Sequence, residues 1–187
     1  MPRIPYPDLD AIDDPAIHAI LERARKVGTP RPESQAVRAW VPAVIKSFTT
    51  AWMDTFVDGV VDHDLKELCR VYVSKTVDCG YCAAQRSTDA STDESHYDDL
   101  LTYATSDRYS DREKAALAYT DAVVWDSALA TDELWEELHL HFTDPELVEL
   151  GFFIALTSGQ QRWIRTLDLG HRQVLADSDA GLVGAGG

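Results

Sequence analysis

Apolar residues recur every three to four positions through most of this chain, which is the period of an α-helix that buries one face. The clearest case follows Pro42, where one helix face carries Val44, Ile45, Phe48, Trp52, Phe56 and Val57. We interpret this aromatic stripe as core packing rather than the wall of a ligand pocket, because aromatic residues at helical period usually mediate burial. The alternation typical of a strand does not occur, so the pattern predicts an all-α protein with one domain.

Prolines and capping residues divide the chain into about eight helices. Asp14 is the expected N-cap of the first helix and Gly28 its stop, and Ser34 is the expected cap of a short second helix. Ser110 and Glu113 form a capping-box pattern. The stretches with a helical pattern, nine when the short ones are counted separately, cover residues 15–27, 34–40, 42–57, 64–77 (opened by Asp62 or Asp64), 79–90, 96–105, 111–126, 131–142 and 144–169.

The last expected helix, 144–169, is apolar nearly all round in its middle, which is typical of a helix buried centrally or at a subunit interface. We interpret the polar group near its end as packing or subunit contacts rather than substrate ligands; it comprises Gln160, Arg162, Trp163 and Arg165. The expected organisation is an N-terminal extension with one helix (1–33), a helical domain (34–171) and a flexible C-terminal tail (172–187).

The net charge and the hydropathy of the chain exclude several classes of function. The 187 residues carry a formal net charge of −15 with no basic cluster, so we expect no binding to nucleic acid or to anionic membranes. No apolar run approaches the length of a membrane span. Residues 1–10 lack the apolar core of a secretory signal, so we expect a cytoplasmic protein.

Two of the three cysteines, Cys79 and Cys82, form a C-x-x-C motif. Asp78 is the expected N-cap of a helix that opens at Cys79, and unpaired amides at a helix start favour a thiolate. Arg86 lies one turn beyond Cys82, so its guanidinium is expected to reach back to that sulfur. Pure helix-dipole reasoning favours Cys79 as the more reactive thiol, whereas the position of Arg86 favours Cys82.

Positions three apart share a helix face, so the two sulfurs can approach bonding distance. One cysteine can then react with an oxidant to give a sulfenic acid, and the other can condense with it to a disulfide that a thiol reductant resets. A zinc site is the alternative, but zinc needs about four ligands and no second C-x-x-C follows. The third cysteine, Cys69, is interpreted as a small core residue.

Glu67 lies twelve residues before Cys79, on the helix that leads into the motif. A single glutamate on a helix is usually a solvated surface charge. Its spacing to the cysteines makes Glu67 a candidate proton acceptor, or an ion-pair partner for Arg86.

The motif E-x11-C-x-x-C with a basic residue four positions later resembles the carboxymuconolactone decarboxylase and alkylhydroperoxidase D (AhpD-like) superfamily. The resemblance continues in the segments SDREKAALAYTDAVVW, TDELWEEL and FTDPELVELGFFIAL, and covers residues 35–170. It implies an all-helical fold and a homo-oligomer, a trimer or hexamer, with the site near a subunit contact.

By motif position the resemblance makes Cys82 the peroxidatic thiol, Cys79 the resolving thiol and Glu67 the acid of a proton relay. The chain departs from the family pattern at Arg86 and Tyr81, where the peroxidase branch has histidine. Arginine stays charged and cannot relay a proton. The hypothesis is therefore that Arg86 holds the thiolate electrostatically while Glu67 or water transfers protons.

These observations predict a thiol-dependent peroxidase that reduces hydroperoxides, needs no metal or organic cofactor, and is reset by a thiol or dithiol reductant protein. Two alternatives stay open. One is a decarboxylase-type lyase acting on a small cyclic acid, although that branch typically lacks the C-x-x-C pair. The other is a non-catalytic redox-sensing protein whose disulfide changes a partner contact.

Overall fold

The computed structural model describes residues 1–175 and 177–184, and within this part every regular element is a helix. The all-α prediction is confirmed. The α-helices are α1 (Pro15–Val27), α2 (Pro32–Arg38), α3 (Pro42–Trp52), α4 (His63–Thr76), α5 (Gly80–Ala83), α6 (Asp111–Val124), α7 (Asp132–His141) and α8 (Asp144–Arg165). The shorter elements are η1 (Leu9–Ala11), the π-helical turn η2 (Met53–Val57), η3 (Glu94–Tyr97), η4 (Leu100–Thr105) and η5 (Ser127–Leu129).

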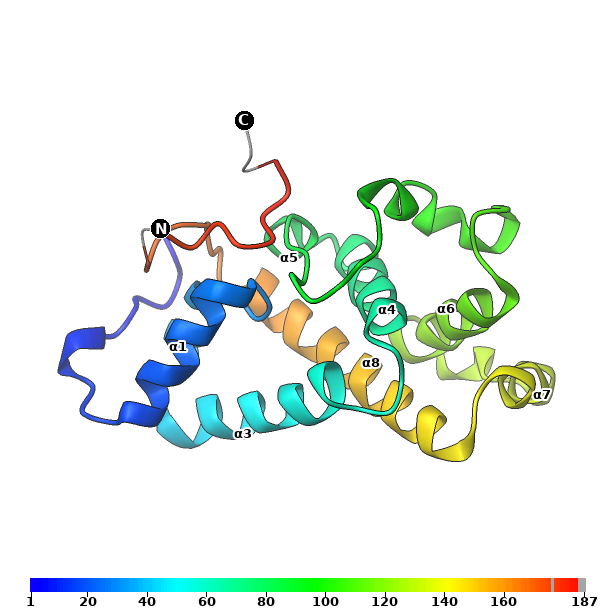
Figure 1. The fold of residues 1–187 in the computed structure, drawn as a ribbon, viewed down its shortest axis with the longest axis horizontal. Coiled ribbons are helices and arrows are strands. Elements are labelled where there is room, and N and C mark those ends of the chain that lie inside the picture. The colour runs from blue at the N-terminus through cyan, green and yellow to red at the C-terminus, as the bar shows by residue number, and fades with distance from the viewer. Residues whose placement is uncertain (176, 185–187) are drawn as a thin grey trace.

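The long helix α8 runs through the middle of the molecule, with α4 and α6 on one side and α1 and α3 on the other (Figure 1). The main core lies between α4, α6 and α8, and a second cluster joins α1, α2 and α3. The aromatic stripe of α3 and η2 packs on Phe153 of α8 as a third cluster. In the described residues, no helix is both long and apolar enough to cross a membrane.

Most expected caps are present. The Asp14 carboxylate accepts from the amide of Ala16, and Ser110 and Glu113 form a complete capping box on α6. The cap expected at Ser34 is wrong: α2 begins at Pro32, and the Ser34 hydroxyl donates to the carbonyl of Arg31 instead. Proline fits the first turn of a helix because it has no amide to satisfy there.

The helix expected over 79–90 is also wrong, because α5 ends at Ala83. Asp78 has a left-handed backbone (φ +51°) and is not the N-cap; Cys79 takes that place. The residues after Arg86 are rich in Ser, Thr and Asp, whose side chains compete with helical hydrogen bonds, and the Ser87 hydroxyl accepts from the amide of Asp89. The expected helix 96–105 is present as the two 3-10 turns η3 and η4.

The described part of the expected C-terminal tail makes specific contacts with the α5 turn. The amide of Arg86 donates to the carbonyl of Gly181 at 2.7 Å, and the amide of Val183 donates to the carbonyl of Ala84 at 2.8 Å. The same segment lies beside α5 in Figure 1. The division of the chain at residues 34 and 171 stays a prediction.

Candidate active site

Cys79 and Cys82 form a disulfide at the turn between α4 and α5, with their Cα atoms 5.3 Å apart. The expectation that the two sulfurs meet is confirmed. The turn holds them from both sides: the Cys79 amide donates to the carbonyl of Ser74 at 3.0 Å, and the Cys79 Sγ accepts from the Cys82 amide at 3.3 Å. Both cysteines are buried, Cys79 the more completely.

A small cavity of about 50 Å³ lies against this turn, and Cys82, but not Cys79, is among the residues that line it. Its other walls come from residues 29–38, from Phe48 and Trp52 on α3, and from α8. The aromatic stripe therefore serves two purposes, because Phe48 and Trp52 are buried core residues and also line the cavity.

Glu67 is fully buried and paired with Arg70, three residues later on the same face of α4. Two parallel hydrogen bonds of 2.5 and 2.7 Å join the carboxylate to the guanidinium, and the amide of Ser87 donates to the same carboxylate at 2.9 Å. Arg70 also donates to the carbonyls of Cys82 and Gln85, at 3.3 and 2.5 Å. The pair thus fixes the backbone that carries the motif cysteine.

The structure does not bring Arg86 to the sulfur as expected. Its Nε and Nη2 donate to the Glu94 carboxylate at 2.8 and 2.6 Å, and its Nη1 donates to the carbonyls of Ala83 and Gln85. The expected pairing with Cys82 is therefore wrong, and so is the alternative pairing with Glu67. The reason is that α5 ends before Arg86, so the two residues do not share a helix face.

Three other arginines, Arg31, Arg38 and Arg70, line the cavity, each at most 4% exposed. Arg70 is matched by Glu67, and the Nε of Arg31 lies 3.5 Å from the carboxylate of Glu33. For Arg38, the residues that the structure describes supply no carboxylate within ion-pair distance.

Arg38 donates only to neutral acceptors: the carbonyl of Ser34 at 2.9 Å, and the amide oxygens of Gln35 and Gln160 at 3.3 and 2.8 Å. Burial lowers the pKa of Arg38 to about 9, so it remains charged near neutral pH. The cavity around Cys82 thus contains one buried positive charge that its own walls do not neutralise.

Tyr81, which stands where the peroxidase branch has histidine, is part of the wall next to Cys82. Its hydroxyl donates to Glu33 at 2.9 Å, and its ring stacks on His171 at 4.5 Å. Burial, followed by the neighbouring Glu33 charge, raises the pKa of Tyr81 well above its usual value. Tyr81 is therefore a neutral hydrogen-bond donor near neutral pH.

Sequence reasoning missed the arginines of the cavity. Arg70 had a usable signal, because a position three residues after a buried glutamate on a helix shares its face. Arg31 lies between the expected helices 15–27 and 34–40, Arg38 lies on the second of them, and nothing in their spacing links them to Cys82. Gln160, which the sequence places among packing residues, lines the cavity and contacts Arg38.

Cys69 is fully buried and free, as expected, and burial raises the pKa of its thiol to about 12. Within residues 1–175 and 177–184, no three His, Cys, Asp or Glu side chains are grouped so that they could hold a metal ion. Of the three cysteines, Cys79 and Cys82 are the two that meet at the turn beside the cavity.

Similarity to known proteins is found in both sequence and structure, although no family model matches the chain. Two uncharacterized proteins of Mycobacterium tuberculosis, MT2376 of strain CDC 1551 / Oshkosh and Rv2313c of strain H37Rv, are each 33% identical to it over 97 residues. This match covers 50% of the chain but only 34% of each relative, so the chain spans about a third of their length.

An AhpD-core structure, an uncharacterized peroxidase-related protein from Ralstonia eutropha JMP134, matches with a TM-score of 0.74 and 23% identity over 89% of this chain and 90% of its own. The chain has the AhpD-like fold. The resemblance seen in the sequence is thus confirmed at the level of the fold.

Two further solved structures are similar to the chain, one described as a protein of unknown function and one as a debrominase. A putative antioxidant defence protein AhpD, ATU0492 from Agrobacterium tumefaciens, matches with a TM-score of 0.62 and 21% identity over 71% of this chain and 93% of its own. The debrominase Bmp8 matches with a TM-score of 0.71 and 19% identity over 90% of this chain and 92% of its own. The fold alone therefore does not determine the reaction.

Proposed function

We propose that this chain is a thiol-dependent peroxidase that reduces hydroperoxides through Cys82 and Cys79. The observation that carries the proposal is that Cys82 lines the cavity whereas Cys79, bonded to it, does not. Cys82 lines the cavity, where a small substrate can meet its sulfur, and Cys79 lies behind it at bonding distance. Such an arrangement suits an attacking thiol and a resolving thiol respectively.

In the first step the Cys82 thiolate attacks the outer oxygen of the hydroperoxide, the O–O bond breaks, and the alkoxide leaving group takes a proton to become an alcohol. Cys82 is then a sulfenic acid. In the second step the Cys79 thiol attacks that sulfur, a disulfide forms and water leaves. A dithiol reductant then exchanges with the disulfide, which returns both thiols and leaves the reductant oxidised.

We assign to the cavity arginines the electrostatic role that was expected of Arg86. Arg38 and Arg70 line the same cavity as Cys82, and nearby positive charge favours the thiolate over the thiol. Glu67 is fully engaged with Arg70 and with the amide of Ser87, so we assign it to holding this geometry. The proposed cycle needs no metal or organic cofactor.

Turnover separates this function from the alternatives. Reduced protein is mixed with hydrogen peroxide or, separately, with cumene hydroperoxide in the presence of an excess of dihydrolipoamide, and peroxide loss is followed in wild type, Cys82→Ser and Cys69→Ser. We expect wild type and Cys69→Ser to consume the hydroperoxide catalytically, and Cys82→Ser to consume none. Hydroperoxide consumption that persists in Cys82→Ser would overturn the assignment.

The alternatives give different results in the same experiment. A redox-sensing protein would lose two thiols per chain in a single oxidation and would not turn over with the reductant. A lyase would consume no hydroperoxide. Because the debrominase Bmp8 has the same fold, debromination is a further reaction to assay if the hydroperoxide is not consumed.

We further propose that the protein acts in the cytoplasm as a homo-oligomer, a trimer or hexamer, and receives electrons from a thiol or dithiol protein. Exposed apolar side chains support the oligomer: Val148 and Phe152 on α8 are 73% and 53% exposed, and Val60 nearby is 65% exposed. Exposed apolar patches of this kind are typical of interfaces. Sedimentation equilibrium of wild type and Phe152→Glu tests it, and a monomeric wild type would contradict it.

A further inference from the structure

Unpartnered polar atoms concentrate in the cavity beside Cys82. In the described part of the chain, five buried side-chain nitrogen or oxygen atoms have no hydrogen-bond partner. Three of them belong to residues that line this cavity: the Nε of Arg31, the Nε1 of Trp52 and the Oε1 of Gln161. The Nε of Arg31 lies 3.5 Å from the Glu33 carboxylate, which compensates it, so the indole N–H of Trp52 and the amide oxygen of Gln161 are the two for which the described residues supply no partner. Buried polar atoms are normally satisfied, so their concentration at one place indicates that the cavity accommodates a polar ligand.

The charge expected of that ligand follows from Arg38. This side chain is 2% exposed, and its guanidinium lies 3.7 Å from the ring centre of Phe48 and 5.1 Å from that of Trp163. The aromatic faces compensate a buried cation only in part. The two neighbouring arginines each have a carboxylate close by, so Arg38 leaves the cavity with a net positive charge.

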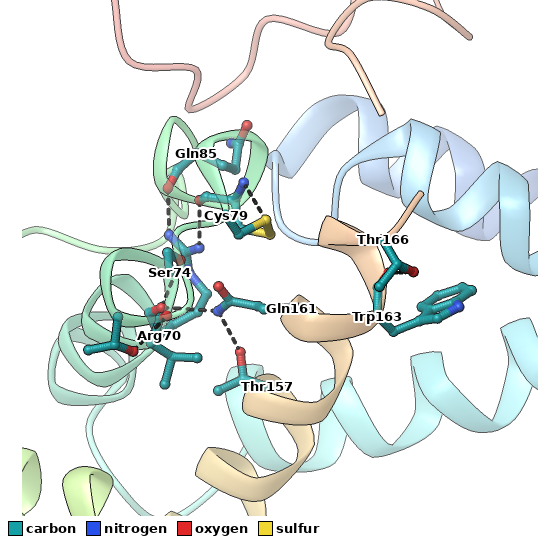
Figure 2. The surroundings of a disulfide bond; sticks show 11 residues. Arg70, Ser74, Cys79, Gln85, Thr157, Gln161, Trp163 and Thr166 are labelled. Atoms are coloured by element: carbon teal, nitrogen blue, oxygen red, sulfur yellow. Dashed lines mark hydrogen bonds between the residues drawn. A yellow bond between two sulfur atoms is a disulfide. The ribbon is translucent and has the colours of Figure 1, made fainter. Parts of the chain in front are cut away.

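The orientation of Gln161 adds an acceptor. Its amide nitrogen donates to the carbonyl of Arg70 and to the hydroxyl of Thr157, both at 3.0 Å. Figure 2 shows this side chain reaching from α8 to α4 beneath the α5 turn. Because a carbonyl can only accept, the bond to Arg70 fixes the amide, and the Oε1 of Gln161 remains without a partner.

We propose that this cavity is a carboxylate-binding site, in which Arg38 and the indole N–H of Trp52 hold the carboxylate of a small substrate whose hydroperoxide group faces Cys82. The inference rests on the proposed function and names its substrate class, a compact carboxylate-bearing hydroperoxide. Gln161 accepts the hydrogen bond of the hydroperoxide O–H. The carboxylate is unchanged in the reaction, in which Cys82 takes the outer oxygen and Cys79 then closes the disulfide.

The size of the cavity limits the substrate. At about 50 Å³ it has room for only about three to five water-sized groups. A carboxylate, one carbon and the hydroperoxide group already fill that space, so a long-chain acid would have to extend outside. We therefore expect preference for small acids over fatty acids.

Alkylation of Cys82 tests the anion site independently of peroxidase activity. Iodoacetate and iodoacetamide react with the same thiolate and differ mainly in the carboxylate of iodoacetate. The ratio measured is the rate constant for iodoacetate divided by that for iodoacetamide, and any change in thiol pKa cancels in it. The ratio is measured on reduced Cys79→Ser protein, with the modified cysteine located by peptide mapping, and is compared with that of a free cysteine peptide. The net charge of −15 on the whole chain works against iodoacetate, so a raised ratio requires a local site.

The expected ratio is about tenfold or more above that of the peptide, as one hydrogen bond to a charged group provides. In the same background, Arg38→Gln is expected to lower the ratio to the level of the peptide or below, and Trp52→Phe to lower it in part. The matched control is Arg108→Gln, which removes the same charge from an exposed arginine paired with Asp99. It should leave the ratio unchanged.

A ratio in the Cys79→Ser protein equal to that of the peptide overturns the proposal, and this result needs no substitution among the residues that line the cavity. An Arg38→Gln protein that is folded by circular dichroism but keeps the high ratio also overturns it. A high ratio that depends on Arg38, in a protein that turns over no hydroperoxide, supports the anion site and refutes the peroxidase. Turnover of hydroperoxide in a protein whose alkylation ratio shows no preference for the carboxylate supports the peroxidase and refutes the anion site.

Discussion

Glu67→Gln should destabilise the protein far more than a conservative, isosteric change on a helix normally does. The substitution keeps the shape of the side chain but removes the negative charge opposite Arg70, which is 4% exposed and stays buried. Breaking one side of a buried ion pair costs about 3–5 kcal/mol, because the remaining charge is left uncompensated. The unfolding equilibrium should therefore shift by roughly 100- to 5,000-fold.

Urea unfolding of the oxidised protein, followed by circular dichroism, measures this effect. With a denaturant slope of about 2 kcal/mol per molar urea, the midpoint should fall by about 1.5–2.5 M. The matched control is Glu94→Gln, which removes the partner of Arg86 at a carboxylate that is 53% exposed. An exposed pair contributes about 0–1 kcal/mol, so the control should barely move the midpoint.

Equal shifts of the urea midpoint in Glu67→Gln and Glu94→Gln would refute the reasoning, since the two glutamates differ in burial and the substitutions are chemically the same. A Glu67→Gln cost below about 1 kcal/mol, the range of an exposed pair, would show that the Glu67–Arg70 pair does not fix the turn. Thiol reactivity in the same variant gives a second readout. If the pair positions Cys82 through its carbonyl, iodoacetamide alkylation of that thiol should change even under conditions where the variant is fully folded.

Three further predictions follow from the site and its surroundings. Arg86→Ala should leave the apparent thiol pKa of Cys82 unchanged, because the Arg86 guanidinium pairs with Glu94 and not with the sulfur. Thiolate absorbance against pH measures this, and a clear rise in that pKa would support the hypothesis that Arg86 holds the thiolate. Native reduced protein should expose two thiols to a thiol reagent at pH 8 and a third only after unfolding, because burial raises the pKa of Cys69 to about 12; three reactive thiols in the native state would contradict this. Gly28→Ala should destabilise the fold by about 1–3 kcal/mol or more in thermal unfolding, because Gly28 has φ +76° and a Cβ there would lie 2.2 Å from the Nε2 of Gln85; unchanged stability would contradict this packing.

The fold is largely predictable from the sequence because its signals are local. Helical period and capping patterns such as Ser110 with Glu113 depend on residues three or four apart, and both are present in the structure. The predictions fail where a local rule is applied outside a helix. The expected contact of Arg86 with Cys82 assumes a helix that continues for another turn, whereas α5 ends at Ala83, so that contact has no geometric basis.

The cavity could not be predicted in the same way, because its walls are distant in sequence. Arg38 and Gln160 are separated by 122 positions and meet only after α2 and α8 pack around the motif. No spacing rule relates two such residues. Among the three arginines of the cavity, Arg70 is the one within reach of sequence reasoning, because its pairing with Glu67 follows from their helical spacing.

The central claim is that Cys82 is oxidised by a hydroperoxide and is then resolved by Cys79 within the same chain. Fully reduced protein is treated with one equivalent of hydroperoxide, quenched with a thiol-blocking reagent and mapped by mass spectrometry, with Cys79→Ser treated in parallel in the presence of a sulfenic acid trap. The account predicts an intrachain Cys79–Cys82 crosslink in wild type and trapped sulfenic acid at Cys82 in the variant. Free thiols at Cys79 and Cys82 after the treatment, or a trapped adduct at a residue other than Cys82, would contradict it.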